Sequence, residues 1–482
     1  MLFNSFEFLL FFPIMIIGFY LLKHKYRWLW LLLGSYYFYM AHEPELLILL
    51  IISTLVDYYC GIKMYEANSK PLKRNYLIIS IITNVGILFV FKYLLFFTSN
   101  IQWLFDFFGT ELLNDQEANS YNFSNILLPI GISFYTFQTM SYSIEIYRGL
   151  IKPERHVGKF ALYVSFFPQL VAGPVERASR LLPQLKENIK LNINNLKEGI
   201  IMMAWGFFLK LVVADRLGIY VDEAFRNPDS QHSLSLVLGS IFFCFQIYYD
   251  FSAYTSIAIG AAKTMGYDLI QNFNQPIFAT SVAEFWKRWH ISFTQWLRDF
   301  IYKPLVKKNR TPRLLAVFIV FFINGLWHGA NWTFVVWSLL NALILIIEIS
   351  TKSIRHSIFN LLHLPKRARE LIGWATGISL IITTLVFFRS PNISHAMVYV
   401  KSMFAFNNSF HVNILDNYFE LLLSIILIFV VQVIYYYKGN SKVYELFTER
   451  TKWTKYSMSL AYILIIVLFA INRQNSFIYF QF

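Results

Sequence analysis

The sequence predicts an all-α protein that crosses a membrane about ten to twelve times. Of the 482 residues, 56% are hydrophobic and only 15% are charged, which is too little charge to cover the surface of a soluble protein. Apolar runs of about 17 to 25 residues recur along the chain, and this is the length that a helix needs to cross the hydrocarbon core. The runs lack the alternation of barrel strands. The runs are therefore expected to be helices, because a helix forms all its backbone hydrogen bonds internally in lipid. We expect one integral-membrane domain over residues 1–482.

The net charge of +14 indicates contact with membrane lipids and no nucleic acid, because Lys and Arg collect in cytoplasmic loops near anionic head groups. Cys60 and Cys244 each lie inside an apolar run. We expect them to be buried thiols, with no disulfide and no metal set. The first apolar run lacks the basic region and cleavage site of a signal peptide, so we expect it to be the first membrane helix.

Four spans are expected at the start of the chain, near 6–22, 28–40, 46–62 and 76–96. Basic residues follow the first and third runs, and glutamates follow the second. The connection at 97–125 carries acidic residues and neither Lys nor Arg. By the positive-inside rule, the N-terminus faces outward and this connection is external.

A short apolar segment follows the next expected span, 126–146. It covers 160–171, contains Pro168 and has basic residues on both sides. About twelve residues are too few to cross the bilayer, so we expect the segment to enter from the inner side and return. Re-entrant backbone survives at membrane depth only when it is buried in protein or lines a wet cavity.

The spans expected near 199–214 and 234–262 are joined by a mixed-charge connection over 215–232. The second of them carries a polar face around Asp250, and such a face must turn towards a cavity or the interior of the helix bundle. Asp250 is the best candidate for a buried functional carboxylate. The alternative is a structural hydrogen-bond anchor.

Residues 284–302 are expected to form one amphipathic helix at the inner membrane surface, because basic residues flank it on both sides. Aromatic residues recur at helical spacing on one face and polar residues on the other. His290 falls on the border between the two faces. It is a candidate site residue, and the alternative is a histidine that anchors the helix at the interface.

The apolar stretch 314–349 lies between two basic loops, so it must cross the membrane outward and return. Its only interruption is 324–332, where His328 lies among glycines and carboxamides. At about 1.5 Å per residue, a helix from residue 314 places His328 roughly 20 Å from the inner surface. An ionisable group at this depth is a candidate functional site. Three more spans are expected, near 371–388, 419–437 and 456–472, with an external C-terminus.

The polar residues of this interruption suit acyl transfer to an alcohol. If the helix continues through it, Asn324, His328 and Asn331 share one stripe. Burial favours the neutral form of histidine, which can accept a proton from a hydroxyl. The carboxamides and the indole N–H groups of Trp327 or Trp332 can donate hydrogen bonds to a developing oxyanion.

A packing role is the alternative for His328, because Gly325 and Gly329 have the spacing of close helix contacts. The sequence lacks the serine elbow, the phosphate loop and the His-Glu-x-x-His motif of other enzyme classes.

Ordered motifs recur along nearly the whole chain, at 128–138, 167–174, 246–252, 285–290, 326–329 and 477–482. With them the chain resembles the membrane-bound O-acyltransferase family, and within it the AlgI-like membrane components of alginate O-acetylation. One departure follows Ser252, where Ala253-Tyr254-Thr255-Ser256 stands in place of Gly-Tyr-Ser-Asp. It weakens any role for that position and leaves Asp250 and both histidines intact.

The resemblance implies a ring of about 10–12 helices with re-entrant segments around a central funnel, whose thin floor holds a histidine. It also implies a reaction, in which an acetyl group passes from cytoplasmic acetyl-CoA across the inner membrane to an exported polysaccharide such as alginate. A periplasmic acyltransferase of the SGNH type is the usual partner. No bound cofactor is implied, since acetyl-CoA is a substrate.

The resemblance also implies roles for residues. His328 matches the essential histidine, as general base or acyl relay near the thioester, and His290 would line the donor entrance. The candidate substrate contacts are Asn324, Trp327, Asn331 and Asp250.

Other functions remain open. O-acetylation of peptidoglycan and D-alanyl transfer to teichoic acid are related reactions on other polymers. A polytopic transporter also fits broken helices and buried polar residues, although the sequence lacks paired broken segments in corresponding halves. A scaffold that only docks its partner is a further alternative, and loss of either histidine would then leave acylation intact.

Overall fold

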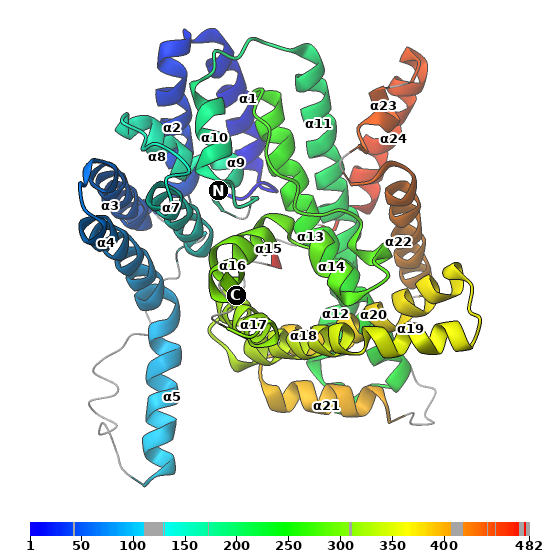
Figure 1. Cartoon of the computed structure of the whole chain (residues 1–482). Helices are drawn as coiled ribbons and strands as arrows, with labels where there is room; N and C mark the ends of the chain where they lie inside the picture. The colour runs from blue at the N-terminus through cyan, green and yellow to red at the C-terminus, as the bar shows by residue number, and fades with distance from the viewer. Residues whose placement is uncertain are drawn as a thin grey trace. The chain divides into compact units, whose positions relative to one another are not determined.

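The computed structural model of the chain describes residues 1–41, 44–109, 129, 131–171, 173–307, 311–405, 418–440, 442–448, 450–471 and 477–478. In these residues every regular element is a helix (Figure 1), which confirms the all-α prediction. Seven of the described helices are long and apolar enough to cross a membrane, and two shorter apolar helices accompany them. The prediction of a multi-pass membrane protein is therefore confirmed, and the ring around a funnel stays a prediction. The seven are Pro44–Glu66, Lys70–Phe107, Ser233–Thr264, Trp332–Ser350, Lys366–Arg389, Phe419–Lys438 and Lys452–Phe469.

The chain forms two compact units. The first is Met1–Asn192 with Met265–Leu269, and the second is Ile193–Thr264 with Ile270–Phe482. One acyltransferase domain over residues 1–482 stays a prediction.

The first unit contains the early spans and the segment expected to be re-entrant. Its α4 continues through a π-helical turn at Phe89–Tyr93 into α5, so that helix runs on to Phe107 where we expected an external connection from residue 97. The remainder of that connection, 110–125, lies outside the described residues. The helices are α1 (Phe6–Leu21), α2 (His24–Met40), α3 (Leu47–Glu66), α4 (Lys70–Leu88), α5 (Leu94–Phe107), α7 (Ile132–Tyr147), α8 (Val157–Ser165), α9 (Phe167–Leu170) and α10 (Ala178–Lys186).

The segment expected to be re-entrant is a pair of short helices, α8 and α9. The first has nine residues, and the second is a single turn with Pro168 near its start. Every residue from Phe160 to Leu170 is buried. The segment is therefore too short to span the bilayer, and its burial meets the condition for backbone at membrane depth.

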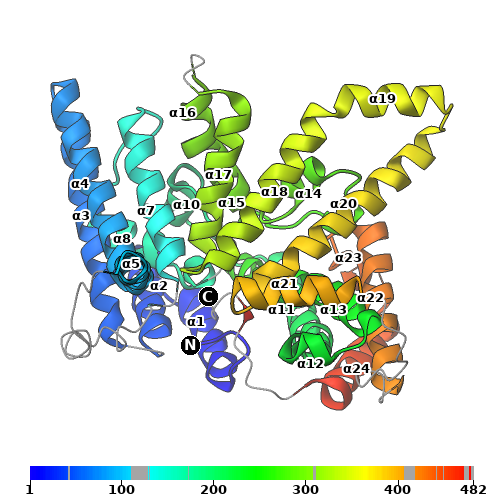
Figure 2. The same cartoon turned by 90° about the horizontal axis from the view of Figure 1, so that it is seen from below.

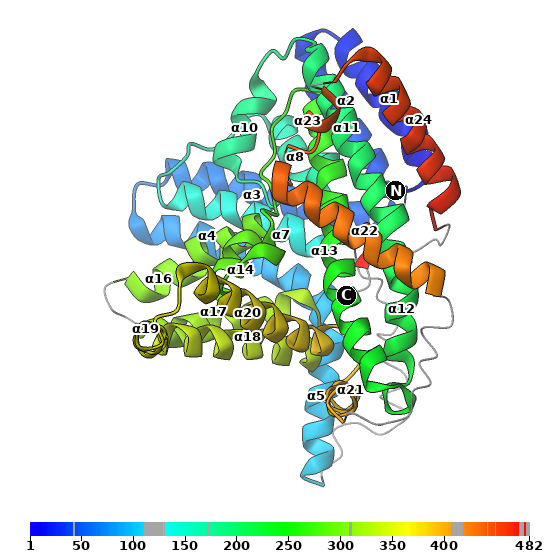
Figure 3. The same ribbon diagram turned by 90° about the vertical axis from the view of Figure 1, so that its right-hand side faces the viewer.

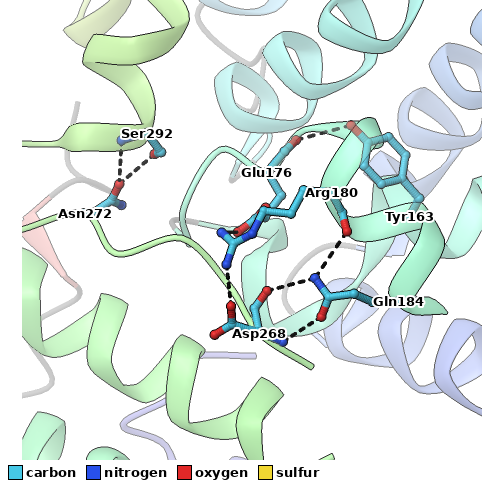
Figure 4. A network of polar contacts seen from close by, with 7 residues as sticks. All are labelled: Tyr163, Glu176, Arg180, Gln184, Asp268, Asn272 and Ser292. Carbon is cyan, nitrogen blue, oxygen red and sulfur yellow. Dashed lines mark hydrogen bonds and ion pairs between the residues drawn. The ribbon is translucent and has the colours of Figure 1, made fainter. Parts of the chain in front are cut away.

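Helix α10 anchors the short segment Met265–Leu269 in the first unit. Arg180 Nη2 lies 2.5 Å from Asp268 Oδ2, and Arg180 Nη1 lies 3.3 Å from Glu176 Oε1. Gln184 Nε2 donates to the Asp268 carbonyl at 3.0 Å, and its Oε1 accepts from the Asp268 N–H at 2.8 Å. Figure 4 shows that an ion pair and a two-way amide contact together hold Asp268.

The second unit contains both candidate histidines. A π-helical turn at Leu209–Ala214 joins α11 to α12, and another at Arg298–Tyr302 joins α15 to α16. The helices are α11 (Ile193–Phe208), α12 (Asp215–Arg226), α13 (Ser233–Thr264), α14 (Val282–Arg288), α15 (Ile291–Leu297), α16 (Lys303–Val306), α17 (Arg313–His328), α18 (Trp332–Ser350), α19 (Lys352–Leu361), α20 (Lys366–Arg389), α21 (Ile393–Met403), α22 (Tyr418–Lys438), α23 (Glu445–Thr448) and α24 (Lys452–Phe469).

Helix α13 is the long central helix of this unit, and α11 lies directly against it (Figure 3). Glycines permit the close approach. A Cβ atom on Gly199 would come within 2.5 Å of the Gly260 carbonyl oxygen, and one on Gly260 within 2.6 Å of the Gly199 oxygen. The polar face of α13 around Asp250 is buried, as the sequence predicts.

The helices of the second unit that were not expected include α12, α19 and α21. The connection over 215–232 is largely helical, because α12 buries an apolar side that includes Leu217 and Val221. Helix α19 lies between α18 and α20 (Figure 2), and α21 follows α20. All three are amphipathic and shorter than a membrane span, so a search for long apolar runs passes over them.

Candidate functional site

The predicted interruption at 324–332 is a break between two helices. Helix α17 ends at His328, and α18 follows after Asn331. Gly329 leaves α17 in an extended conformation. Asn331 begins α18, because its Oδ1 accepts a hydrogen bond from the Thr333 N–H at 3.0 Å. The broken hairpin is therefore confirmed. The single stripe of Asn324, His328 and Asn331 is wrong, because the helix stops between the last two.

Glycines allow the two arms of the hairpin to touch. A Cβ atom on Gly325 would lie 2.8 Å from the Phe334 carbonyl oxygen and from Val335 Cα, and one on Gly329 would lie 2.3 Å from the Phe334 ring. The close packing that we considered as the alternative is thus present. Gly325 and Gly329 make this close packing, and His328 lies between these two glycines in the sequence.

Aromatic side chains surround His328, which is only 6% exposed. The ring centroids of Trp337 and Phe388 lie 5.0 Å and 5.3 Å from the imidazole centroid, both at steep angles to it. The Trp327 ring lies at 4.8 Å. Such an environment restricts water and strengthens any electrostatic interaction with the imidazole.

The helix expected over 284–302 is broken at His290. Helix α14 ends at Arg288, and α15 begins at Ile291. His290 lies between them in the left-handed region, with φ 43° and ψ 54°, and is 1% exposed. The prediction of a histidine on the border of one amphipathic helix is therefore wrong. The break turns the imidazole into the second unit.

An aromatic pair brings the two histidines together. Phe293 and Trp327 are stacked, with ring centroids 4.0 Å apart. The His290 ring lies 4.9 Å from Phe293 and 5.6 Å from Trp327, and the His328 ring contacts the same two rings at 6.2 Å and 4.8 Å. Two candidates that are 38 positions apart in the sequence thus share one cluster, which also includes Phe251 at 4.7 Å from His290.

Burial lowers the pKa of His290 to about 3 from its ordinary value of 6.5. Desolvation disfavours the charged imidazolium. His290 is therefore neutral at pH 7, and a neutral imidazole can accept a hydrogen bond or a proton.

An apolar cavity of about 170 Å³ lies beside α17. Asn324 lines it one helical turn before His328, and the same Asn324 donates a hydrogen bond to Ser338 Oγ at 2.8 Å. Trp286 forms another wall, and Arg298 and Tyr302 add polar groups. The cavity thus offers an apolar interior with a small number of polar groups, as small-molecule sites commonly do.

A second cavity, of about 620 Å³, lies at the C-terminal end of α17. The break residues Gly329 and Asn331 line it, together with the charged side chains of Asp222 and Arg389, which are paired at 2.9 Å. Asn331 Nδ2 also donates to the Pro391 carbonyl at 2.9 Å. This cavity is more polar than the first and suits a hydrophilic ligand.

Asp250 belongs to a separate buried network. Its Oδ1 lies 2.7 Å from Lys210 Nζ, and its Oδ2 accepts from the Ile478 N–H at 2.7 Å. Lys210 also lies 2.9 Å from Asp215. Both oxygens of Asp250 are thus used within the protein, as the structural alternative requires. A substrate contact by Asp250 stays a prediction and requires one of these partners to leave.

Sequence reasoning missed several residues of the site. Phe293, Trp337 and Phe388 form the aromatic surroundings of the histidines, and single apolar residues give no such signal. Lys210 was detectable, since a lone charge within an apolar run needs a buried partner. The part of the chain that the structure describes contains no group of His, Cys, Asp and Glu arranged to hold a metal ion. The closing motif is described only at residues 477–478, and 479–482 lie outside the described residues.

Comparison with known proteins finds that the family model of the membrane-bound O-acyltransferase family matches residues 154–385. The probable alginate O-acetylase AlgI of Pseudomonas putida is 35% identical over 415 residues, which cover 85% of this chain and 81% of the relative. The peptidoglycan O-acetyltransferase of Helicobacter pylori is 31% identical over 443 residues, covering 84% and 80%. The teichoic acid D-alanyltransferase of Bacillus subtilis is 25% identical over 236 residues, covering 46% and 59%.

The region that matches the family model, residues 154–385, includes the positions of both histidines of the aromatic cluster. The first two of these relatives align with most of this chain. The chain belongs to the membrane-bound O-acyltransferase family and is an O-acyltransferase.

Proposed function

We propose that this protein transfers an acetyl group from acetyl-CoA, on the inner side of the cell inner membrane, to an exported polysaccharide of the alginate kind. The acceptor class follows the similarity to probable alginate O-acetylases. The charge pattern of the loops supports external termini. A periplasmic acyltransferase of the SGNH type would complete the delivery.

One observation carries the proposal: His328, at the end of α17, lies in the sequence between residues that line the two cavities. Asn324 lines the apolar cavity one turn before His328, and Gly329 lines the polar cavity directly after it. The Phe388 ring that contacts His328 also lines the polar cavity. A thioester held in the first cavity and a hydroxyl held in the second would therefore approach the same imidazole from two sides.

The chemistry requires a base and hydrogen-bond donors. His328 accepts the proton of the acceptor hydroxyl while the hydroxyl oxygen attacks the thioester carbonyl carbon. The carbon–sulfur bond breaks, and the leaving thiolate takes the proton from the imidazolium. Asn324 and the Trp327 indole are the nearest candidates to donate to the oxyanion. His290, across the Phe293–Trp327 pair, would bound the donor side.

Peptidoglycan is the second candidate acceptor, because the Helicobacter pylori relative carries that polymer in its name. The transporter that the sequence left open is less well supported, since the family consists of acyltransferases.

The test is acetate released by mild base from surface polymers of a deletion strain. The strain is complemented with wild type, His328→Ala or His356→Ala at matched membrane protein levels. His356 is an exposed histidine of α19 and serves as the control. Wild type and the control should restore ester acetate, and His328→Ala should not. Full restoration of ester acetate by His328→Ala would show that His328 is not the base. In the strain with wild type, the polymer that carries the acetyl ester identifies the acceptor.

A further inference from the structure

The segment after α13 pairs with the loop that carries His290. The Asn274 N–H donates to the Arg288 carbonyl at 3.0 Å, and the Ile291 N–H donates to the Asn272 carbonyl at 2.9 Å. One of these backbone bonds precedes His290 and the other follows it. The loop is therefore held on both sides of the histidine.

His290 needs such support because of its backbone. The left-handed region is sparsely populated by residues other than glycine, and a residue stays there only when its surroundings determine its conformation. His290 is one of the few described residues other than glycine with a positive φ. Release of the loop would let it return to a common conformation and move the imidazole.

The side chain of Asn272 adds the most specific contacts to this loop. Its Oδ1 accepts from Ser292 Oγ at 2.6 Å and from the Ser292 N–H at 3.3 Å (Figure 4). A backbone N–H can only donate, so these two bonds identify the oxygen of the amide. Asn272 is fully buried, and its Nδ2 has no acceptor among the described residues. The side chain of Asn272 therefore interacts with the protein through its oxygen.

We propose that Asn272 is a positioning residue, which holds the His290 loop so that the imidazole rests against the Phe293–Trp327 pair. The proposal rests on the proposed function, in which His290 bounds the donor side of the reaction. Asn272 acts through Ser292 and the loop backbone.

The experiment compares three variants of the full-length protein in detergent. Asn272→Ala removes the contact with Ser292. Asn272→Asp keeps an oxygen that can accept both bonds from Ser292. It replaces only Nδ2, which has no acceptor among the described residues. Asn274→Ala is the matched control, since Asn274 is two positions away and its side chain is exposed.

Two readouts are measured. The first is kcat and KM for acetyl-CoA in transfer to a soluble polysaccharide acceptor, measured with the periplasmic acyltransferase added. We expect Asn272→Ala to lower kcat about 100-fold with KM changed less than threefold, because a misplaced group near the reacting atoms can cost this much. Asn272→Asp should recover most of the loss, and Asn274→Ala should match wild type.

The second readout is modification of His290 by diethyl pyrocarbonate, measured by peptide mass. Buried His290 should be protected in wild type, Asn274→Ala and Asn272→Asp, and should become reactive in Asn272→Ala. Because this readout needs no turnover, it separates the two proposals. A wild type that transfers no acetyl group contradicts the proposed function, whereas the protection pattern still reports on the loop.

Equal protection and equal kcat in folded Asn272→Ala and wild type would overturn the positioning role. If Asn272→Ala does not fold, Ser292→Ala replaces it, since that variant removes the shorter of the two bonds and leaves the Ser292 N–H in place. Unchanged protection and unchanged kcat in Ser292→Ala would likewise contradict the proposal.

Discussion

Acidification is expected to destabilise the protein through His290. Burial lowers the pKa of this histidine to about 3, whereas in the unfolded chain it titrates near 6.5. Between these two values the unfolded chain binds a proton that the folded protein does not bind. Stability contributed by neutral His290 is therefore present above pH 6.5 and is lost progressively as the pH falls towards 3.

The size of the effect follows from the two pKa values. Each pH unit between them is worth about 1.4 kcal/mol, so the free energy of unfolding should fall by about 2 kcal/mol between pH 7 and pH 5 because of this one group. Other groups also titrate in this range. The measured quantity is therefore the difference between wild type and His290→Gln, a variant with a polar side chain that does not titrate.

Denaturant titrations of the purified protein at pH 5, 6 and 7 give that difference. Wild type should lose about 2 kcal/mol more than His290→Gln between pH 7 and pH 5. Parallel pH dependence in the two proteins would show that His290 is protonated in the folded state. The burial argument and the close aromatic contacts would then be refuted together.

Three further predictions follow from the second unit. His328→Gln should lower kcat about 10²- to 10⁴-fold, as expected for loss of a general base, while the control His356→Gln stays active. A kcat of His328→Gln within tenfold of wild type would contradict the role of His328 as the base. Lys210→Met removes the cation between Asp215 and Asp250 and should lower the free energy of unfolding by about 3–5 kcal/mol. An unchanged unfolding midpoint would show that the carboxylates are not charged. Gly325→Val should destabilise the hairpin by about 1–3 kcal/mol, because the new atoms meet backbone at 2.8 Å; thermal stability equal to wild type would mean that the two arms can separate.

Much of the fold was predictable because membrane helices carry their signal locally. A run of apolar residues identifies a span without knowledge of its neighbours, and α13, α18 and α20 agree with the expected spans. The amphipathic helix α12 was not predictable in this way. Its charged residues mark it as a connection, and only the burial of Leu217 and Val221 shows that it packs as a helix.

The histidines were predictable as separate candidates, and their arrangement was not. His328 lies within the only interruption of an apolar hairpin, which is a local signal. The break at His290 has none, because the residues around it keep helical periodicity and buried Trp289 and Phe293 fit one helix face. The break is stabilised by hydrogen bonds that the backbone and side-chain oxygens of Asn272 accept, and Asn272 lies 18 positions before His290. Sequence periodicity cannot report a conformation that depends on such a distant partner.

The dependence of the His290 backbone on Asn272 also explains why two histidines that were predicted at different membrane depths share one cluster. A continuous helix over 284–302 would have kept His290 at the membrane surface, on the border of a polar face. The left-handed turn instead directs the imidazole inward, where the Phe293–Trp327 pair separates it from His328. Helix α14 can then end at a basic, partly exposed side chain, Arg288, while the next two residues enter the buried region. A short break therefore connects the basic, partly exposed end of α14 with the buried aromatic site.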